Sequence, residues 1–176
     1  MEEIIVSTRK VYSGRIVKLD VHEVVLNDGQ HTKREQIRHP GAAAIVAIDE
    51  QQNVLLVRQY RLPAGRVMIE LPAGTMYEDE PPFDCALREM QEETGYKPDV
   101  LEPLGGYYTA PGYTTEFIHL FLGTKLRPST LAGDQDEYIE LLRMPFAEAL
   151  DKAERGEFQD GKTIIGLSRA ARKLAL

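Results

Sequence analysis

Apolar and polar positions alternate along most of residues 4–38, as in extended chain. Alternating segments at 16–25 and 32–37 flank Asn27-Asp28-Gly29, a sequence typical of a tight hairpin turn. His39-Pro40-Gly41 then interrupts the pattern, because proline lacks an amide donor and glycine relaxes the backbone. The pattern therefore predicts a small antiparallel sheet at the start of the chain.

The rest of the chain mixes strand and helix patterns without strict alternation. Short apolar, partly β-branched runs predict strands, and apolar residues spaced at helical intervals predict helices. Residues 127–136 are polar and predict a loop. We expect an N-terminal sheet over residues 1–39 and one α/β domain over residues 40–176. The strands are expected at 42–48, 54–60, 68–71, 117–122 and 138–144, and the helices at 83–94, 146–155 and 163–176.

The clearest helix carries an acidic face. Proline is favoured in the first turn of a helix, so we expect this one to begin at Pro81, and Gly95 suits a left-handed C-cap. At about 100° per residue, an apolar stripe faces the core while a neighbouring stripe presents Glu89, Glu92 and Glu93. One face of the helix is thus predicted to pack and the other to present three carboxylates.

These carboxylates repel one another. Glu89 and Glu93 are one helical turn apart, and their repulsion costs roughly a few tenths of a kcal/mol unless a positive charge intervenes. Hard oxygen ligands suit Mg²⁺ or Mn²⁺, which keep positions open for water and phosphate. The alternative is a glutamate-rich helix face that is simply solvated.

The spacing around the glutamates favours the metal. The segment from Gly74 to Tyr96 reads GTMYEDEPPFDCALREMQEETGY and resembles the Nudix box at every specified position. The resemblance implies an α/β/α sandwich with a mixed sheet, on which the box forms a loop, a helix and a second loop. It also implies metal ligation by Glu89, Glu92, Glu93 and the main-chain oxygen of Ala73, and a bracing pair formed by Glu80 and Arg88.

Hydrolysis of a pyrophosphate also needs a base that takes a proton from the attacking water. In the ADP-ribose pyrophosphatases that this chain resembles, the base commonly comes from a flexible loop well after the box, here residues 127–136 and their exit. Glu137 is the first candidate, followed by Asp136 and Glu140. A solvated acidic loop is the alternative.

Further segments resemble the same subfamily. Pro111 lies sixteen residues after Gly95, although an ordinary Pro-Gly turn would look the same. The segments around Arg58, Arg61 and Glu70 resemble paired substrate-binding segments, in which one or both arginines would grip the diphosphate and Glu70 would accept a hydrogen bond from the adenine amino group. A surface salt bridge is the alternative for either arginine alone.

The extended segment before Pro40 resembles an N-terminal sheet that these enzymes exchange across a homodimer. Arg34 and Arg38 are candidates to reach the substrate from this sheet, with a plain strand surface as the alternative. The chain contains no tryptophan, so a tyrosine, a phenylalanine or an apolar residue would have to stack on adenine.

The composition of the chain limits the kinds of partner that the protein is expected to bind. The formal net charge of −7 argues against binding to nucleic-acid backbones, which needs a dense basic footprint. The single cysteine, Cys85, fits a reducing cytoplasm, and the chain shows neither a secretion signal nor a membrane-spanning run. We expect a soluble cytoplasmic homodimer that acts on a small nucleoside diphosphate substrate.

Together, the residues and the resemblance imply Mg²⁺-dependent hydrolysis of ADP-ribose to AMP and ribose 5-phosphate. One alternative is a Nudix activity on NADH, nucleotide sugars or dinucleoside polyphosphates. The other is a sensor that binds ADP-ribose without hydrolysing it. The intact glutamates argue against the sensor, because clustered negative charge near a diphosphate gives a pure binder no advantage.

Overall fold

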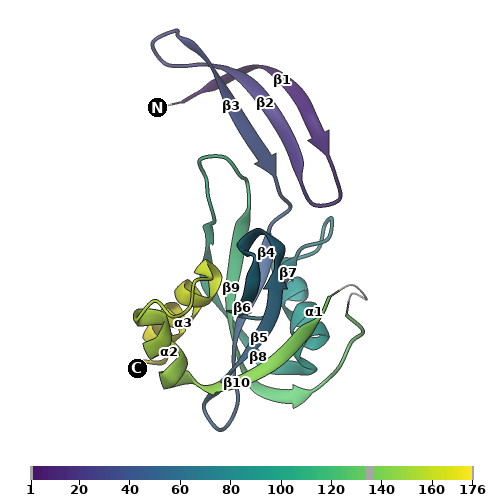
Figure 1. Ribbon diagram of the computed structural model, residues 1–176, viewed down its shortest axis with the longest axis vertical. Helices are drawn as coiled ribbons and strands as arrows, with labels where there is room; N and C mark the ends of the chain where they lie inside the picture. The colour runs from purple at the N-terminus through teal and green to yellow at the C-terminus, as the bar shows by residue number, and fades with distance from the viewer. Residues whose placement is uncertain (1, 134–136, 176) are drawn as a thin grey trace. The chain divides into compact units, whose positions relative to one another are not determined.

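The computed structural model describes residues 2–133 and 137–175. The chain forms two compact units, which are described separately (Figure 1). The first comprises Met1–Gly41 and Tyr107–Phe117, and the second Ala42–Gly106 and Ile118–Leu176. The elements are β1 (Ile4–Ser13), β2 (Lys18–Val25), β3 (His31–Arg38), β4 (Ala42–Ile48), β5 (Asn53–Arg61), η1 (Leu62–Ala64), β6 (Arg66–Glu70), β7 (Ala73–Thr75), α1 (Pro82–Thr94), β8 (Tyr96–Tyr108), β9 (Phe117–Pro128), β10 (Ile139–Pro145), α2 (Phe146–Glu154) and α3 (Gly161–Leu174).

The first unit contains the predicted antiparallel sheet, with strand order β1-β2-β3. The predicted turn joins β2 to β3, and Gly29 adopts a φ of 83°, a left-handed conformation that favours glycine. One face of β2 is buried at Asp20, His22 and Val24, whereas no residue of β1 is buried. Residues 107–117 also belong to this unit, because Ile37 donates a backbone hydrogen bond to the Tyr113 carbonyl at 2.7 Å.

The second unit is built on a mixed sheet with the order β10-β5-β4-β9-β8. β4 and β9 are parallel, and β4 pairs with β5 in the antiparallel sense. The short strands β6 and β7 are consecutive in the chain, and they pair with β5 and β4 respectively. The Ala73–Thr75 strand is thereby fixed to the central β4, directly before the helix of the box.

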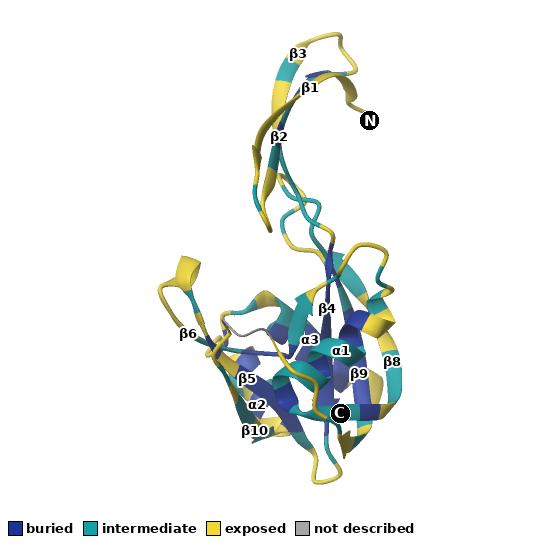
Figure 2. Ribbon diagram, turned by 90° about the vertical axis from the view of Figure 1, so that its right-hand side faces the viewer, coloured by how far each residue is buried: buried dark blue, intermediate teal, exposed yellow. Residues whose placement is uncertain are grey.

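Helices cover both faces of this sheet. Cys85, Ala86 and Met90 of α1 form one apolar cluster with alternate residues of β4 and β5. A second cluster joins the opposite residues of these strands to α2 and α3. Figure 2 shows β4 and β9 deeply buried between these layers. This arrangement confirms the predicted α/β/α sandwich.

The structure contains elements that were not predicted, among them β7, η1 and β8. The strand β8 was not predicted, because Pro98, Pro103 and the Gly105-Gly106 pair obscure the strand pattern. β8 lies at the end of the sheet order, where proline is tolerated in a strand. β9 also continues to Pro128, so Arg127 belongs to a strand rather than to the predicted loop. Among the described residues, no helix has the length and apolar character to cross a membrane.

Candidate active site

The loop before α1 and the acidic face of the helix are joined by close contacts. Glu93 accepts a hydrogen bond from the Ala73 backbone N–H at 2.9 Å. The Glu89 carboxylate lies against Gly74, where an added Cβ would overlap its oxygens. Any larger residue at position 74 would therefore displace Glu89. At the other end of the helix, Gly95 adopts a φ of 74° and forms the expected left-handed C-cap.

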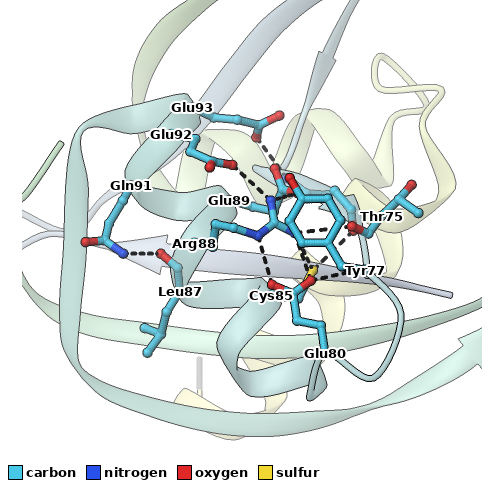
Figure 3. A network of polar contacts seen from close by, with 12 residues as sticks. Thr75, Tyr77, Glu80, Cys85, Leu87, Arg88, Glu89, Gln91, Glu92 and Glu93 are labelled. Atoms are coloured by element: carbon cyan, nitrogen blue, oxygen red, sulfur yellow. Dashed lines mark hydrogen bonds and ion pairs between the residues drawn. The ribbon is translucent and has the colours of Figure 1, made fainter. Parts of the chain in front are cut away.

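Arg88 ties the box loop to the acidic face (Figure 3). Its Nε and Nη2 donate to the two oxygens of Glu80 at 2.8 and 2.9 Å. Its Nη1 donates to one oxygen of Glu89 at 2.6 Å and to one oxygen of Glu92 at 2.9 Å. The Glu80–Arg88 pair that the resemblance implies is thus formed, and the same guanidinium also orients Glu89 and Glu92.

The acidic face is short of positive charge. Burial, the largest cause, raises the pKa of Glu89 to about 7, and the negative charges of Glu92 and Glu137 add to this effect. Burial raises the pKa of Glu93 to about 8, again with a contribution from Glu137 and from Glu89. The charge and the hydrogen bond of Arg88 lower the pKa of Glu89 but do not outweigh burial, whereas the hydrogen bond from Arg88 lowers the pKa of Glu80 overall. A further cation near these carboxylates would favour their charged forms.

The donor set fits a hard divalent cation in its chemistry, because the glutamates and the Ala73 carbonyl supply oxygen ligands. Within residues 2–133 and 137–175, however, no group of three His, Cys, Asp or Glu side chains is arranged to hold a metal as it stands. Arg88 and the Ala73 N–H occupy the oxygens to which they donate. The raised pKa values favour the fit, because they show buried carboxylates with too little neutralising charge.

Of the candidate bases, Glu137 is the one whose charge acts on the glutamates of the acidic face. Its charge contributes to the raised pKa of both Glu89 and Glu93, and its own side chain is exposed. Glu140 pairs in register with Arg58 of β5 and contacts it at 3.4 Å. Asp136 lies outside the described residues. Glu137 therefore stays the first candidate.

The two arginines of β5 point to opposite faces of the sheet, since they are three residues apart on a strand. Arg61 lies on the α1 face with Leu55, and its charge interacts with that of Glu93. Arg58 lies on the other face, in the exposed ion pair with Glu140. The structure thus brings Arg61 to the acidic cluster, and Arg58 forms the surface salt bridge that was the alternative.

Glu70 is the centre of a second charged network. Its side chain is 2% exposed, and its oxygens accept from Arg61 Nε and Nη2, both at 2.8 Å. Lys162 Nζ also donates to Glu70, and to Asp160 at 3.0 Å. Burial alone would raise the pKa of Glu70, but the hydrogen bonds from Arg61 and the charge of Lys162 lower it overall. Both Glu70 oxygens therefore accept hydrogen bonds within the protein, and the contact of Glu70 with the adenine amino group stays a prediction.

Lys162 and Asp160 were not foreseen from the sequence. Asp160 accepts from the Thr163 backbone N–H at 3.0 Å and caps α3. This cap places Lys162 in the first turn, where its charge lowers the pKa that burial raises at Glu93. The Asp-Gly-Lys-Thr sequence signals a helix start, but it does not indicate a partner ninety-two residues away.

The remaining candidate residues belong to the first unit. Arg34 and Pro111 line one pocket of about 460 Å³ in that unit, which His22 and Tyr113 also line. Arg34 donates to Glu3 from Nε and Nη2, at 3.0 and 2.6 Å. Arg38 Nε donates to the buried Asp20 at 2.6 Å. The structure therefore brings Arg34 and Pro111 together and engages both arginines in ion pairs.

A sandwich fold with a carboxylate-bearing helix and a bracing arginine defines a known class of protein. The NUDIX domain model matches residues 38–165, and the chain belongs to the Nudix family.

The proteins to which this chain is similar carry different functional names. The chain is 40% identical over 168 residues to the methanol dehydrogenase activator of Bacillus methanolicus, covering 94% of this chain and 91% of the relative. It is 36% identical over 180 residues to the ADP-ribose pyrophosphatase of Bacillus subtilis strain 168, covering 100% and 96%. The crystal structure of an ADP compounds hydrolase superposes with a TM-score of 0.87 at 21% identity, covering 99% and 95% of the two chains. This last match supports the fold.

Proposed function

We propose that this protein is a Mg²⁺-dependent pyrophosphatase that hydrolyses ADP-ribose to AMP and ribose 5-phosphate. The observation that carries the proposal is the buried acidic face of α1, where the pKa values of Glu89 and Glu93 rise to about 7 and 8. The match to the ADP-ribose pyrophosphatase of Bacillus subtilis along the whole chain supports the choice of substrate.

In this proposal Glu89, Glu92, Glu93 and the Ala73 carbonyl hold the divalent ions. When bound, Mg²⁺ supplies positive charge to the phosphoryl oxygens and lowers the pKa of water. Mn²⁺ has the same ligand preferences and is expected to substitute for Mg²⁺.

The protein's own side chains perform the remaining steps. Arg61 and Lys162, held beside Glu93 by the buried Glu70, bind oxygens of the diphosphate through charge-assisted hydrogen bonds. Glu137 accepts a proton from the attacking water as the new P–O bond forms and the bond to the bridging oxygen breaks. Because this carboxylate is exposed, it can take part while the buried glutamates stay in place.

We further propose that the sheet of residues 1–39 serves in dimerisation and that residues 40–176 form the hydrolase domain, apart from residues 107–117, which belong to the first unit. The large apolar residues of β1 are open to solvent, with Ile4, Ile5 and Val6 exposed by 66, 57 and 55%. Exposed large apolar side chains of this kind suit a protein partner, here a second copy of the chain. Arg34, Arg38 and Pro111 are proposed to contact substrate in that dimer. The single buried thiol of Cys85 supports a cytoplasmic location.

Release of AMP from ADP-ribose in the presence of Mg²⁺ tests the proposal. We expect Glu93→Gln to lower kcat by at least about a hundredfold, since it removes one charge from the centre of the site. Glu102→Gln is the matched control, because Glu102 is a half-exposed β8 carboxylate paired with Lys173 at 3.3 Å. Glu137→Gln in the same assay tests the base.

Two results would contradict the proposal. Equal rates for Glu93→Gln and the wild type would remove the metal-ligand assignment. Turnover of nucleotide sugars or NADH as fast as of ADP-ribose would remove the substrate assignment. Tight binding of ADP-ribose without release of AMP would instead identify a sensor.

A further inference from the structure

Tyr77 covers the arginine that orients the acidic face. The Arg88 Cζ atom lies 4.2 Å from the centroid of the Tyr77 ring (Figure 3). The Tyr77 backbone N–H also donates to Glu80 at 2.9 Å, the carboxylate that Arg88 grips. Tyr77 therefore contacts the Glu80–Arg88 pair through both its ring and its main chain.

The guanidinium beneath this ring has little freedom. Arg88 donates from Nε, Nη1 and Nη2, and Nη2 also reaches the Thr75 carbonyl at 3.2 Å. Its side chain is 17% exposed, whereas Tyr77 is 60% exposed and forms the outer layer. The ring thus shields the guanidinium from solvent on one side, while the hydrogen bonds fix its edges.

The orientation of Arg88 determines which carboxylate oxygens remain available. Nη1 donates to Oε1 of Glu89 and to Oε2 of Glu92, so one oxygen of each glutamate is held by the guanidinium. The second oxygen of each is then oriented by the first. Partners that orient the ligands of a metal affect its affinity without touching the ion.

We propose that Tyr77 is a positioning residue for the divalent cations, and that it acts through a cation–π contact with Arg88. This inference rests on the proposed function, because it assumes that Glu89 and Glu92 hold the ions. Loss of the ring leaves the guanidinium charge and its hydrogen bonds in place and removes one of the contacts that hold the guanidinium in its orientation. Metal affinity should therefore fall, rather than rise from any loss of competing positive charge.

A series of substitutions separates this role from simple apolar cover. The attraction of a cation to a ring depends on the ring quadrupole, which is largest for Trp and absent in Leu. Tyr77→Phe and Tyr77→Trp keep the contact, while Tyr77→Leu keeps an apolar side chain without it. Tyr108→Leu is the matched control, because Tyr108 is 57% exposed and contacts the Phe117 ring rather than a charge.

The experiment is a titration of each metal-free variant with Mn²⁺, with the melting temperature measured alongside. We expect Tyr77→Leu to weaken Mn²⁺ binding by about two- to fivefold, and Tyr77→Phe, Tyr77→Trp and Tyr108→Leu to bind about as tightly as wild type or tighter. Wild-type affinity in Tyr77→Leu, with or without a lower melting temperature, would overturn the inference. So would a loss in Tyr77→Phe equal to that in Tyr77→Leu. Absence of Mn²⁺ binding by the wild type would overturn the metal site itself, and with it the proposed function.

Discussion

Two buried charged clusters of the second unit differ in how their charges balance. Around Glu70, the side chains of Arg61 and Lys162 supply two positive charges to Glu70 and Asp160, and the pKa of Glu70 falls. On the acidic face of α1, Arg88 is the one cation that contacts the box glutamates in the described residues, and the pKa of Glu89 rises. The charges of the first cluster balance one another, whereas the second cluster has more negative than positive charge.

This difference indicates that Glu70 and the glutamates of α1 have separate roles, although nothing in the sequence distinguishes these carboxylates by charge. A balanced buried network stabilises the fold and holds its cations in place, and breaking it leaves unpaired charge. A buried cluster with an excess of negative charge reduces the stability of the fold until a cation binds to it. The two clusters should therefore respond to loss of a carboxylate in opposite directions.

The largest expected effect on stability is at Glu70. We expect Glu70→Gln to reduce the free energy of unfolding at neutral pH by about 2 kcal/mol, less than for a fully buried pair because Arg61 is partly exposed. The pKa of Glu70 is lowered in the folded protein, so this stabilisation is present above about pH 4.5 and is lost as the pH falls through the folded pKa. Denaturant unfolding at several pH values measures the change. A difference from wild type that persists undiminished in acid would contradict the account.

A smaller effect of opposite sign is expected at Glu93 in metal-free protein. Its pKa rises from 4.5 to about 8 on folding, so the charged carboxylate opposes folding increasingly as the pH rises through this range. Glu93→Gln removes that cost, and its melting temperature at about pH 9 should exceed that of wild type by a few degrees. The gain should be small at about pH 5, where the folded wild type already holds a proton on Glu93. Destabilisation at the higher pH would place Glu93 in a balanced cluster instead.

Local patterns predicted the elements that carry the acidic face. The acidic stripe of α1 and the Gly95 cap depend on helical periodicity and on one backbone conformation, and both occur as predicted. The Glu80–Arg88 pair, which the family resemblance implied, is formed as well. These contacts join residues that are close together in the sequence, so the sequence alone is enough to predict them.

Contacts between distant segments were not predictable in this way. Lys162 reaches Glu70 from α3, and no local pattern links them. The burial of Glu70 depends on how the end of β6 packs against α3, which the sequence does not reveal. The pairing of residues 107–117 with β3 depends in the same way on tertiary structure. The Pro and Gly residues of β8 also concealed a strand that only its place at the sheet edge explains.

The most direct measurement is calorimetric titration of metal-free protein with Mn²⁺ at about pH 8, in wild type and in Glu93→Gln. At this pH, proton release should accompany binding and come mainly from Glu93, whose pKa is about 8, because the carboxylates must be charged to hold the ion. The account predicts binding by wild type with release of protons, and at least about tenfold weaker binding by Glu93→Gln. Equal affinity in the two proteins, or no binding by wild type, would contradict it.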